Sequence, residues 1–188
     1  MMLRRALGLL SLSAIVCAAS AVPARAQDTP KDAAAAIKAG FIADLDELQG
    51  KFVGLAEAFP QDTYKWRPME GVRSVSEVLM LAAFEGYTFI PNSFGAPPMA
   101  LGSREEMAKI RATSDKAEVV AHLKKAFAYA KSQMQALDPG TLTGKHKVMG
   151  TDMTVSETQI HISGDLHEHL GQLIAYARMN HIVPPWSK

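Results

Sequence analysis

Apolar residues recur every three or four positions along most of the chain, which is the spacing of helices that bury one face. The pattern is clearest near the beginning, where the recurring apolar residues are Ile37, Phe41, Leu45, Leu48, Phe52, Leu55 and Phe59. The same spacing predicts four long helices, over 30–59, 74–89, 116–137 and 156–180. Because no series of alternating residues could build a sheet, we expect an all-α fold, a four-helix bundle.

Capping patterns place the expected helix ends. Ser74 with Glu77, and Ser156 with Gln159, match the capping box at a helix start. Pro91 is expected to end the second helix, since proline lacks the backbone N–H that a helix interior needs. A short additional helix is expected after residue 103, and 141–155 reads as a loop in which a short hairpin remains open.

The first 26 residues have the organisation of a secretory signal peptide. Arg4 and Arg5 precede an uncharged apolar run over 6–22, and Ala24-Arg25-Ala26 matches a small-x-small cleavage site. A permanent membrane anchor is the alternative, but the run is short for a spanning helix. We therefore expect a periplasmic or secreted protein with one domain over 27–188.

Charge and cysteine content narrow the classes of partner. Without residues 1–26 the chain loses three arginines and no acids, which leaves 17 Lys and Arg against 19 Asp and Glu. This slightly acidic balance, without a basic cluster, argues against nucleic acid and against a membrane surface after signal cleavage. The one cysteine, Cys17, lies in the signal peptide, so disulfides and thiolate metal ligands are excluded from the expected domain.

The fourth helix carries the clearest candidate chemistry. At about 100° per residue, Asp165, His169, Gln172 and Tyr176 fall within an arc of roughly 60°. This arc borders an apolar stripe that includes Leu166, so its polar groups need partners. A bound metal ion and a hydrogen-bonded network would each satisfy them.

Three segments resemble the DinB-like (DinB/YfiT) superfamily: 64–68 with Trp66 and Pro68, 71–79, and 168–186 with His169 and Gly171. The resemblance covers nearly all of the expected domain. It implies a four-helix bundle, often dimeric, with a divalent metal held by three histidines. One of these comes from the second helix and two from a His-x3-His pair on the fourth. Such proteins include thiol-dependent transferases and isomerases, and others are described as metal-dependent hydrolases.

The chain departs from this pattern at two of the three histidine positions. His169 matches the last histidine, whereas Asp165 and Leu81 occupy the other two positions. Glu85 lies one turn beyond Leu81 and could replace the missing ligand. A site of Glu85, Asp165 and His169 would hold one divalent ion, such as zinc, manganese, nickel or iron. The alternative is that no ion binds and that a protonated His169 lies between the two carboxylates.

Other polar residues near these positions have weaker assignments. His161 is a candidate ligand or a hydrogen-bond partner of one, although a half-exposed helix histidine is the simpler interpretation. Gln172 and Tyr176 could line the site, as could Leu81, and hydrogen bonds between helices explain the first two equally well. Gly171 is expected to permit close approach of a neighbouring helix, and Arg73 to pair with an acid.

Two classes of function are therefore open. One is an exported DinB-like enzyme of hydrolase or transferase type that depends on a divalent metal in an altered site and acts on an unidentified small molecule. The other is a non-catalytic helical bundle that binds a small apolar ligand or a protein partner. A homodimer is compatible with both.

Overall fold

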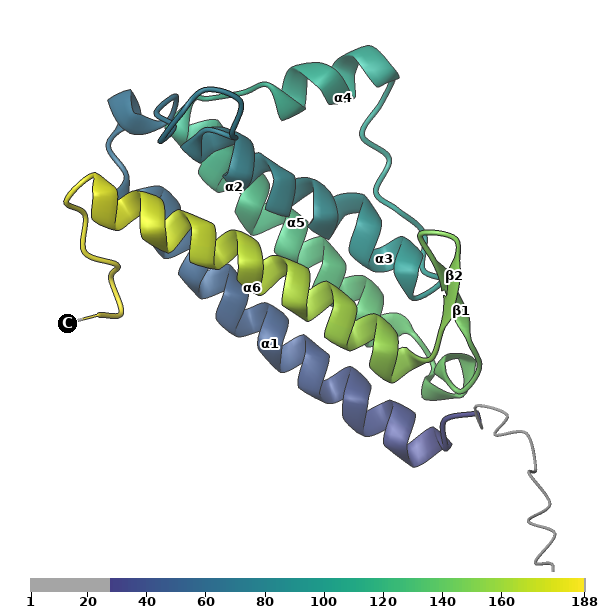
Figure 1. Cartoon of the computed structure of the whole chain (residues 1–188). Coiled ribbons are helices and arrows are strands. Elements are labelled where there is room, and N and C mark those ends of the chain that lie inside the picture. Colours follow the sequence, from purple (N-terminus) through teal and green to yellow (C-terminus); the bar gives the residue numbers. More distant parts are fainter. Residues whose placement is uncertain (1–27, 188) are drawn as a thin grey trace, which may run out of the picture.

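A computed structural model describes residues 28–187, and the expected signal peptide lies outside the described residues. Four long helical segments run side by side along the molecule (Figure 1). They are α1 (Lys31–Ala58), α2 (Val75–Phe84) with its continuation, α5 (Lys116–Ala136) and α6 (Val155–Met179). The predicted all-α four-helix bundle is therefore confirmed. Among the described residues, no helix combines the length and apolar character needed to cross a membrane.

Short elements complete the bundle. The helix α4 (Arg104–Arg111) lies beside α2 on the outside of the bundle, and an antiparallel hairpin of β1 (His146–Val148) and β2 (Thr151–Met153) lies near the start of α6 (Figure 1). Two 3-10 turns, η1 (Gln61–Thr63) and η3 (Pro139–Leu142), follow α1 and α5. The hairpin, which the sequence left open, occupies part of the expected 141–155 loop.

The core forms where α1 and α2 each pack against both α5 and α6. Phe41, Leu45 and Phe52 from the predicted apolar face of α1 are fully buried. The Phe52 ring lies 5.7 Å from the ring of Phe127 on α5, centroid to centroid. Each such side chain contributes roughly 1.5–3 kcal/mol by leaving water. The three-and-four spacing of the sequence thus identifies the faces that hold the bundle together.

The N-cap of α6 lies two residues before the predicted N-cap, Ser156. Thr154 is the N-cap, and its hydroxyl accepts a hydrogen bond from the backbone N–H of Glu157. The Glu157 carboxylate in turn accepts from the N–H of Thr154 at 2.7 Å. The predicted box of Ser156 and Gln159 is wrong because the carboxylate at 157 is the better partner for a positive helix end. This start also buries Val155.

The second long helix contains a π turn that the sequence did not predict. It passes from α2 into η2 (Glu85–Phe89) and then into α3 (Ile90–Ser93). Pro91 therefore does not end the helix, which runs to Ser93. The carbonyl of Tyr87, four residues before Pro91, accepts a hydrogen bond from the N–H of Met99 at 2.7 Å. An N–H from a distant loop replaces the one that proline lacks, so the helix continues for another turn.

Candidate metal site

Glu85, Asp165 and His169 meet between the second and the last long helix. Asp165 and His169 are one turn apart on α6, and Glu85 is the first residue of the π turn η2. His169 Nε2 lies 3.3 Å from Glu85 Oε1 and 3.7 Å from Asp165 Oδ1. One ligand atom from each residue lies within 4.8 Å of the other two. Two carboxylates and an imidazole thus converge from two helices.

The spacing of these atoms is close to that of ligands bound to one shared ion. Ligand atoms that share one tetrahedral ion at about 2.1 Å lie roughly 3.4 Å from one another. The two measured separations from the His169 ring bracket that value. The two separations from the His169 ring are therefore compatible with one shared divalent ion.

Burial adds a second reason to regard Glu85 as a ligand. The residue is only 8% exposed, and its Oε2 atom has no hydrogen-bond partner among the described residues. A buried polar atom without a partner costs about 1–3 kcal/mol, and more when it is charged. The contact between Glu85 and His169 therefore leaves an acceptor unsatisfied, which a bound cation would satisfy.

The three groups also perturb one another's protonation. Burial raises the pKa of the Glu85 carboxyl, and the nearby Asp165 carboxylate raises it further. The hydrogen-bonding contact with Glu85 raises the pKa of His169, against the opposite effect of burial. Two ionised carboxylates at this position therefore repel each other unless a positive charge, either a protonated His169 or a bound cation, lies between them.

The sequence model of the DinB superfamily matches residues 44–173, which is well over half of the chain. The chain belongs to the DinB superfamily. The matched segment includes all three residues of the candidate site. No curated protein matches this DinB-superfamily chain.

The other predicted residues of this DinB-superfamily protein lie around the site without joining it. His161 is exposed and lies outside the group of converging ligands found among residues 28–187. Tyr176 is buried, and its hydroxyl donates to the carbonyl of Arg73 at 3.0 Å while accepting from Gln172 Nε2 at 2.8 Å. The Tyr176 hydroxyl therefore ties α6 to the segment before α2, and Gln172 supports that hydroxyl from the same helix. Leu81 is half-buried and faces a neighbouring cavity.

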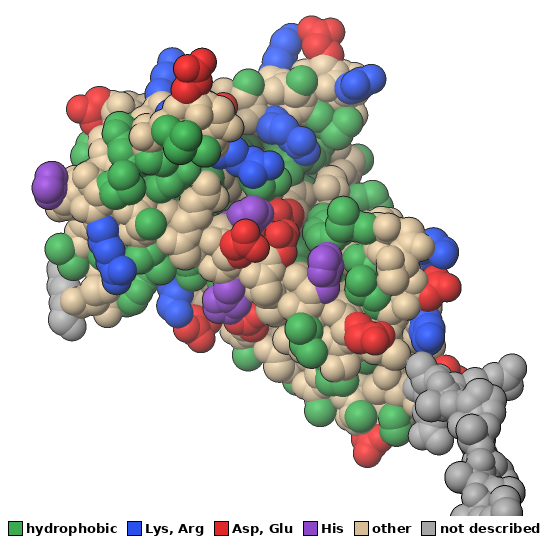
Figure 2. Space-filling model, in the orientation of Figure 1, with side chains coloured by type: hydrophobic (Ala, Val, Ile, Leu, Met, Phe, Trp, Pro, Cys, Tyr) green, Lys and Arg blue, Asp and Glu red, His purple; other side chains and the backbone are tan. Residues whose placement is uncertain are grey.

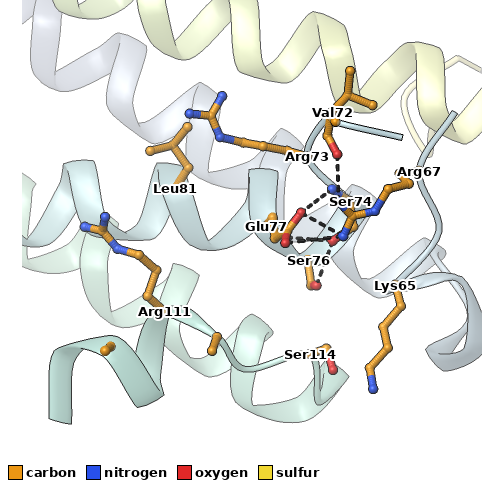
Figure 3. Close-up of a pocket in the computed structure, with 13 residues that line it drawn as sticks. Lys65, Arg67, Val72, Arg73, Ser74, Ser76, Glu77, Leu81, Arg111 and Ser114 are labelled. Carbon is orange, nitrogen blue, oxygen red and sulfur yellow. Dashed lines mark hydrogen bonds and ion pairs between the residues drawn. The ribbon is translucent and has the colours of Figure 1, made fainter. Parts of the chain in front are cut away.

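That cavity is a further feature of this DinB-superfamily chain that the sequence did not predict. It has a volume of about 780 Å³ and lies between the 65–74 segment, α2 and the end of α4 (Figure 3). We call it the basic pocket; the residues that define it here are Lys65, Arg67, Arg73, Glu77, Leu81 and Arg111. Helical periodicity could not reveal it, because its charged residues come from separate segments that meet only in the folded chain.

Two further expectations need correction. Arg73 has no acidic partner within ion-pair distance in the described part of the chain, whereas Arg67 pairs with Glu77 at 3.2 Å. Gly171 lies on an exposed part of α6, where an added Cβ would meet nothing within 4 Å. The close helix approach occurs instead at Gly86, where an added Cβ would lie 3.0 Å from the backbone of Ala126 on α5.

Proposed function

We propose that the protein is an exported, divalent-metal-dependent member of the DinB superfamily whose ion is held by Glu85, Asp165 and His169. The observation that carries the proposal is the buried Glu85 Oε2 atom, which has no partner among the described residues, in a residue that lies within ligand distance of Asp165 and His169. The other interpretation, a metal-free ionic network, leaves that acceptor unsatisfied in a buried position.

The donor set favours particular ions. Two carboxylate oxygens and one imidazole nitrogen form a harder set than three imidazoles, and they suit zinc, manganese, iron or nickel. Three protein ligands leave further coordination positions for water or a substrate. An ion held in this way would supply Lewis-acid chemistry, as in metal-dependent hydrolases and transferases.

The surroundings support a small-molecule reaction over a purely structural ion. Leu81, one turn before Glu85 on the same helix, lines the basic pocket, so a molecule bound there would lie near the proposed ion. On the face drawn in Figure 2, acidic and histidine side chains gather near the centre, with Lys and Arg side chains just above them toward α4. The reaction class we propose is hydrolysis or group transfer on a substrate that enters from this side.

The test is the metal content of the domain over 27–188, purified without chelator, together with its thermal unfolding. We expect about one equivalent of a transition metal per chain, lost in Glu85→Gln, Asp165→Asn and His169→Gln. These substitutions keep side-chain volume, so the variants should fold. His161→Gln is the matched control, because His161 lies on the same helix but outside the group.

Added metal provides a second readout. An ion at 100 times its Kd stabilises the folded state by about 2.7 kcal/mol, which raises Tm by roughly 5–10 °C in a domain of this size. The rise should be absent in the three variants and present in the control. A protein that stays metal-free and shows no rise with zinc, manganese or nickel would refute the metal site. That result would favour the non-catalytic bundle that binds a small ligand or a protein partner.

A further inference from the structure

The basic pocket has a charge that its own contacts do not neutralise. Of its charged side chains, Lys65, Arg67, Arg73 and Arg111 are basic and Glu77 alone is acidic. The expected domain as a whole carries slightly more acids than bases, so this local excess of positive charge is not a general property of the surface. Positive charge in a concave site attracts and concentrates anions.

The acidic residue of the pocket is already committed to the start of α2. Glu77 accepts a hydrogen bond from the backbone N–H of Ser74 at 2.6 Å and pairs with Arg67 at 3.2 Å. Figure 3 shows this group drawn together by dashed contacts at the beginning of the helix. Within residues 28–187, the side chains of the remaining three cations, Lys65, Arg73 and Arg111, have neither a carboxylate partner nor a hydrogen bond.

The side chain of Arg111 and the backbone of Arg73 are each held by a contact of their own. The Arg111 guanidinium lies over the ring of Phe84, 4.3 Å from its centroid, which fixes it beside the residue that precedes Glu85. The backbone of Arg73 is tied to α6 by the Tyr176 hydroxyl at 3.0 Å. In the view of Figure 3 the Arg73 and Arg111 side chains extend toward Leu81. The pocket therefore contains two guanidinium groups, one on α4 and one on the segment before α2, and a separate contact anchors each residue.

We propose that the basic pocket binds the carboxylate or phosphate group of a small molecule through Arg73 and Arg111. A planar guanidinium donates two parallel hydrogen bonds to either oxyanion, which suits it to both. The apolar side chains of Leu81, Ala108 and Ala112 line the same space and would accept an apolar body next to the charged group. The ligand class is thus a small amphipathic anion.

The position of the pocket gives this anion a role in the proposed function. Leu81, which lines the pocket, lies one turn before Glu85, and Arg111 lies over the ring of Phe84, the residue that precedes Glu85. The pocket therefore adjoins the candidate metal site along the second long helix. The suggestion that the bound anion is the substrate rests on the proposed function, whereas anion binding by the arginines does not. The two ideas can be tested separately.

The experiment is isothermal titration calorimetry of the domain over 27–188 with three probes of similar size: phenyl phosphate, benzoate and the neutral benzyl alcohol. Each titration is done on chelator-treated protein, on protein loaded with zinc, and on Asp165→Asn. We expect both anions to bind all three preparations, benzyl alcohol to bind none, and the affinity to fall with added salt.

Variants identify the groups responsible. Arg73→Gln and Arg111→Gln should each weaken anion binding by about tenfold or more, as expected for the loss of a charged hydrogen-bond donor. Lys109→Gln is the matched control, since it removes one positive charge from α4 outside the basic pocket. It should change Kd by no more than about twofold. Thermal unfolding of each variant checks that the fold is retained.

The outcomes separate this proposal from the metal site. Anion binding that persists without metal and depends on the two arginines supports the pocket, even if metal binding fails. Anion binding that requires zinc and is unchanged in both arginine variants would show that the anion binds the metal ion, and it would overturn the proposal for the basic pocket. Equal affinity for benzyl alcohol, or no saturation by either anion at millimolar concentrations, would also overturn it.

Discussion

Replacing Gly86 by alanine should destabilise the bundle, although alanine is the better helix former. Gly86 is the second residue of the π turn and lies against α5. A Cβ built at this position would lie 3.0 Å from both the carbonyl carbon and the oxygen of Ala126, and 3.1 Å from its Cβ. Carbon atoms in good contact are about 3.5–4.0 Å apart, so α5 or the π turn would have to move.

The magnitude follows from two opposing effects. Insertion of a methyl group into a packed region costs about 1–3 kcal/mol, whereas alanine gains up to about 1 kcal/mol over glycine in a helix. Gly171→Ala is the matched control, because its added Cβ on α6 meets nothing within 4 Å and the change should only stabilise. The two variants should therefore differ by about 2 kcal/mol, or roughly 4–8 °C in Tm.

The assay is calorimetry and urea unfolding of both variants beside the unsubstituted domain, without metal. Gly86→Ala should have the lower Tm and Gly171→Ala a Tm at or above that of the unsubstituted protein. If the two variants were equally stable, the close approach of the π turn to α5 would be refuted. Because Glu85 precedes Gly86, a displaced turn should also weaken zinc binding in Gly86→Ala and leave it unchanged in Gly171→Ala.

Two further predictions concern the segment before α2 and its anchor. The hydrogen bond from the Ser74 backbone, with a smaller effect of Arg67, lowers the pKa of Glu77, so its ionised form stabilises the fold at neutral pH. The stability advantage over Glu77→Gln should be complete above the ordinary glutamate pKa of about 4.3 and should disappear as the pH falls through the lowered pKa of Glu77. Urea unfolding of both proteins between neutral and acid pH checks this. A difference in stability that does not change with pH would contradict it. Tyr176→Phe removes the donor to the Arg73 carbonyl and should lower the free energy of unfolding by about 1–2 kcal/mol without changing metal content. Loss of metal in that variant would show instead that the hydroxyl belongs to the site.

The parts of the structure that the sequence predicted depend on local spacing. The buried face of α1 follows from apolar residues three and four apart, and the proximity of Asp165 and His169 follows from their separation by one turn. Glu85 was expected from its position one turn beyond Leu81. Its meeting with His169, at 3.3 Å, depends on how the second helix packs against α6, which spacing alone does not fix.

The features that sequence reasoning missed depend on contacts between distant segments. The helix continues past Pro91 because the N–H of Met99 donates to the Tyr87 carbonyl, and no local sequence pattern predicts that hydrogen bond. Glu77 pairs with Arg67 and not with Arg73 because of how the segment before α2 folds, and Arg111 reaches the same pocket because α4 packs against α2. Gly86 and Gly171 look alike in the sequence, and only the fold distinguishes a crowded glycine from an exposed one.

The π turn also affects how this chain is compared, residue by residue, with other members of its superfamily. A π turn closes its hydrogen bonds over five residues, as in the bond from Ile90 N–H to the Glu85 carbonyl, whereas an ordinary helix closes them over four. Relative to a bundle whose second helix is regular, every residue after the turn is therefore offset by one position. Leu81 and Glu85 precede that offset and can be matched directly, but from Phe89 onward a gap-free comparison would pair residues that face different directions. Comparisons of the second helix across the superfamily therefore need a one-residue gap within the π turn, between Glu85 and Phe89.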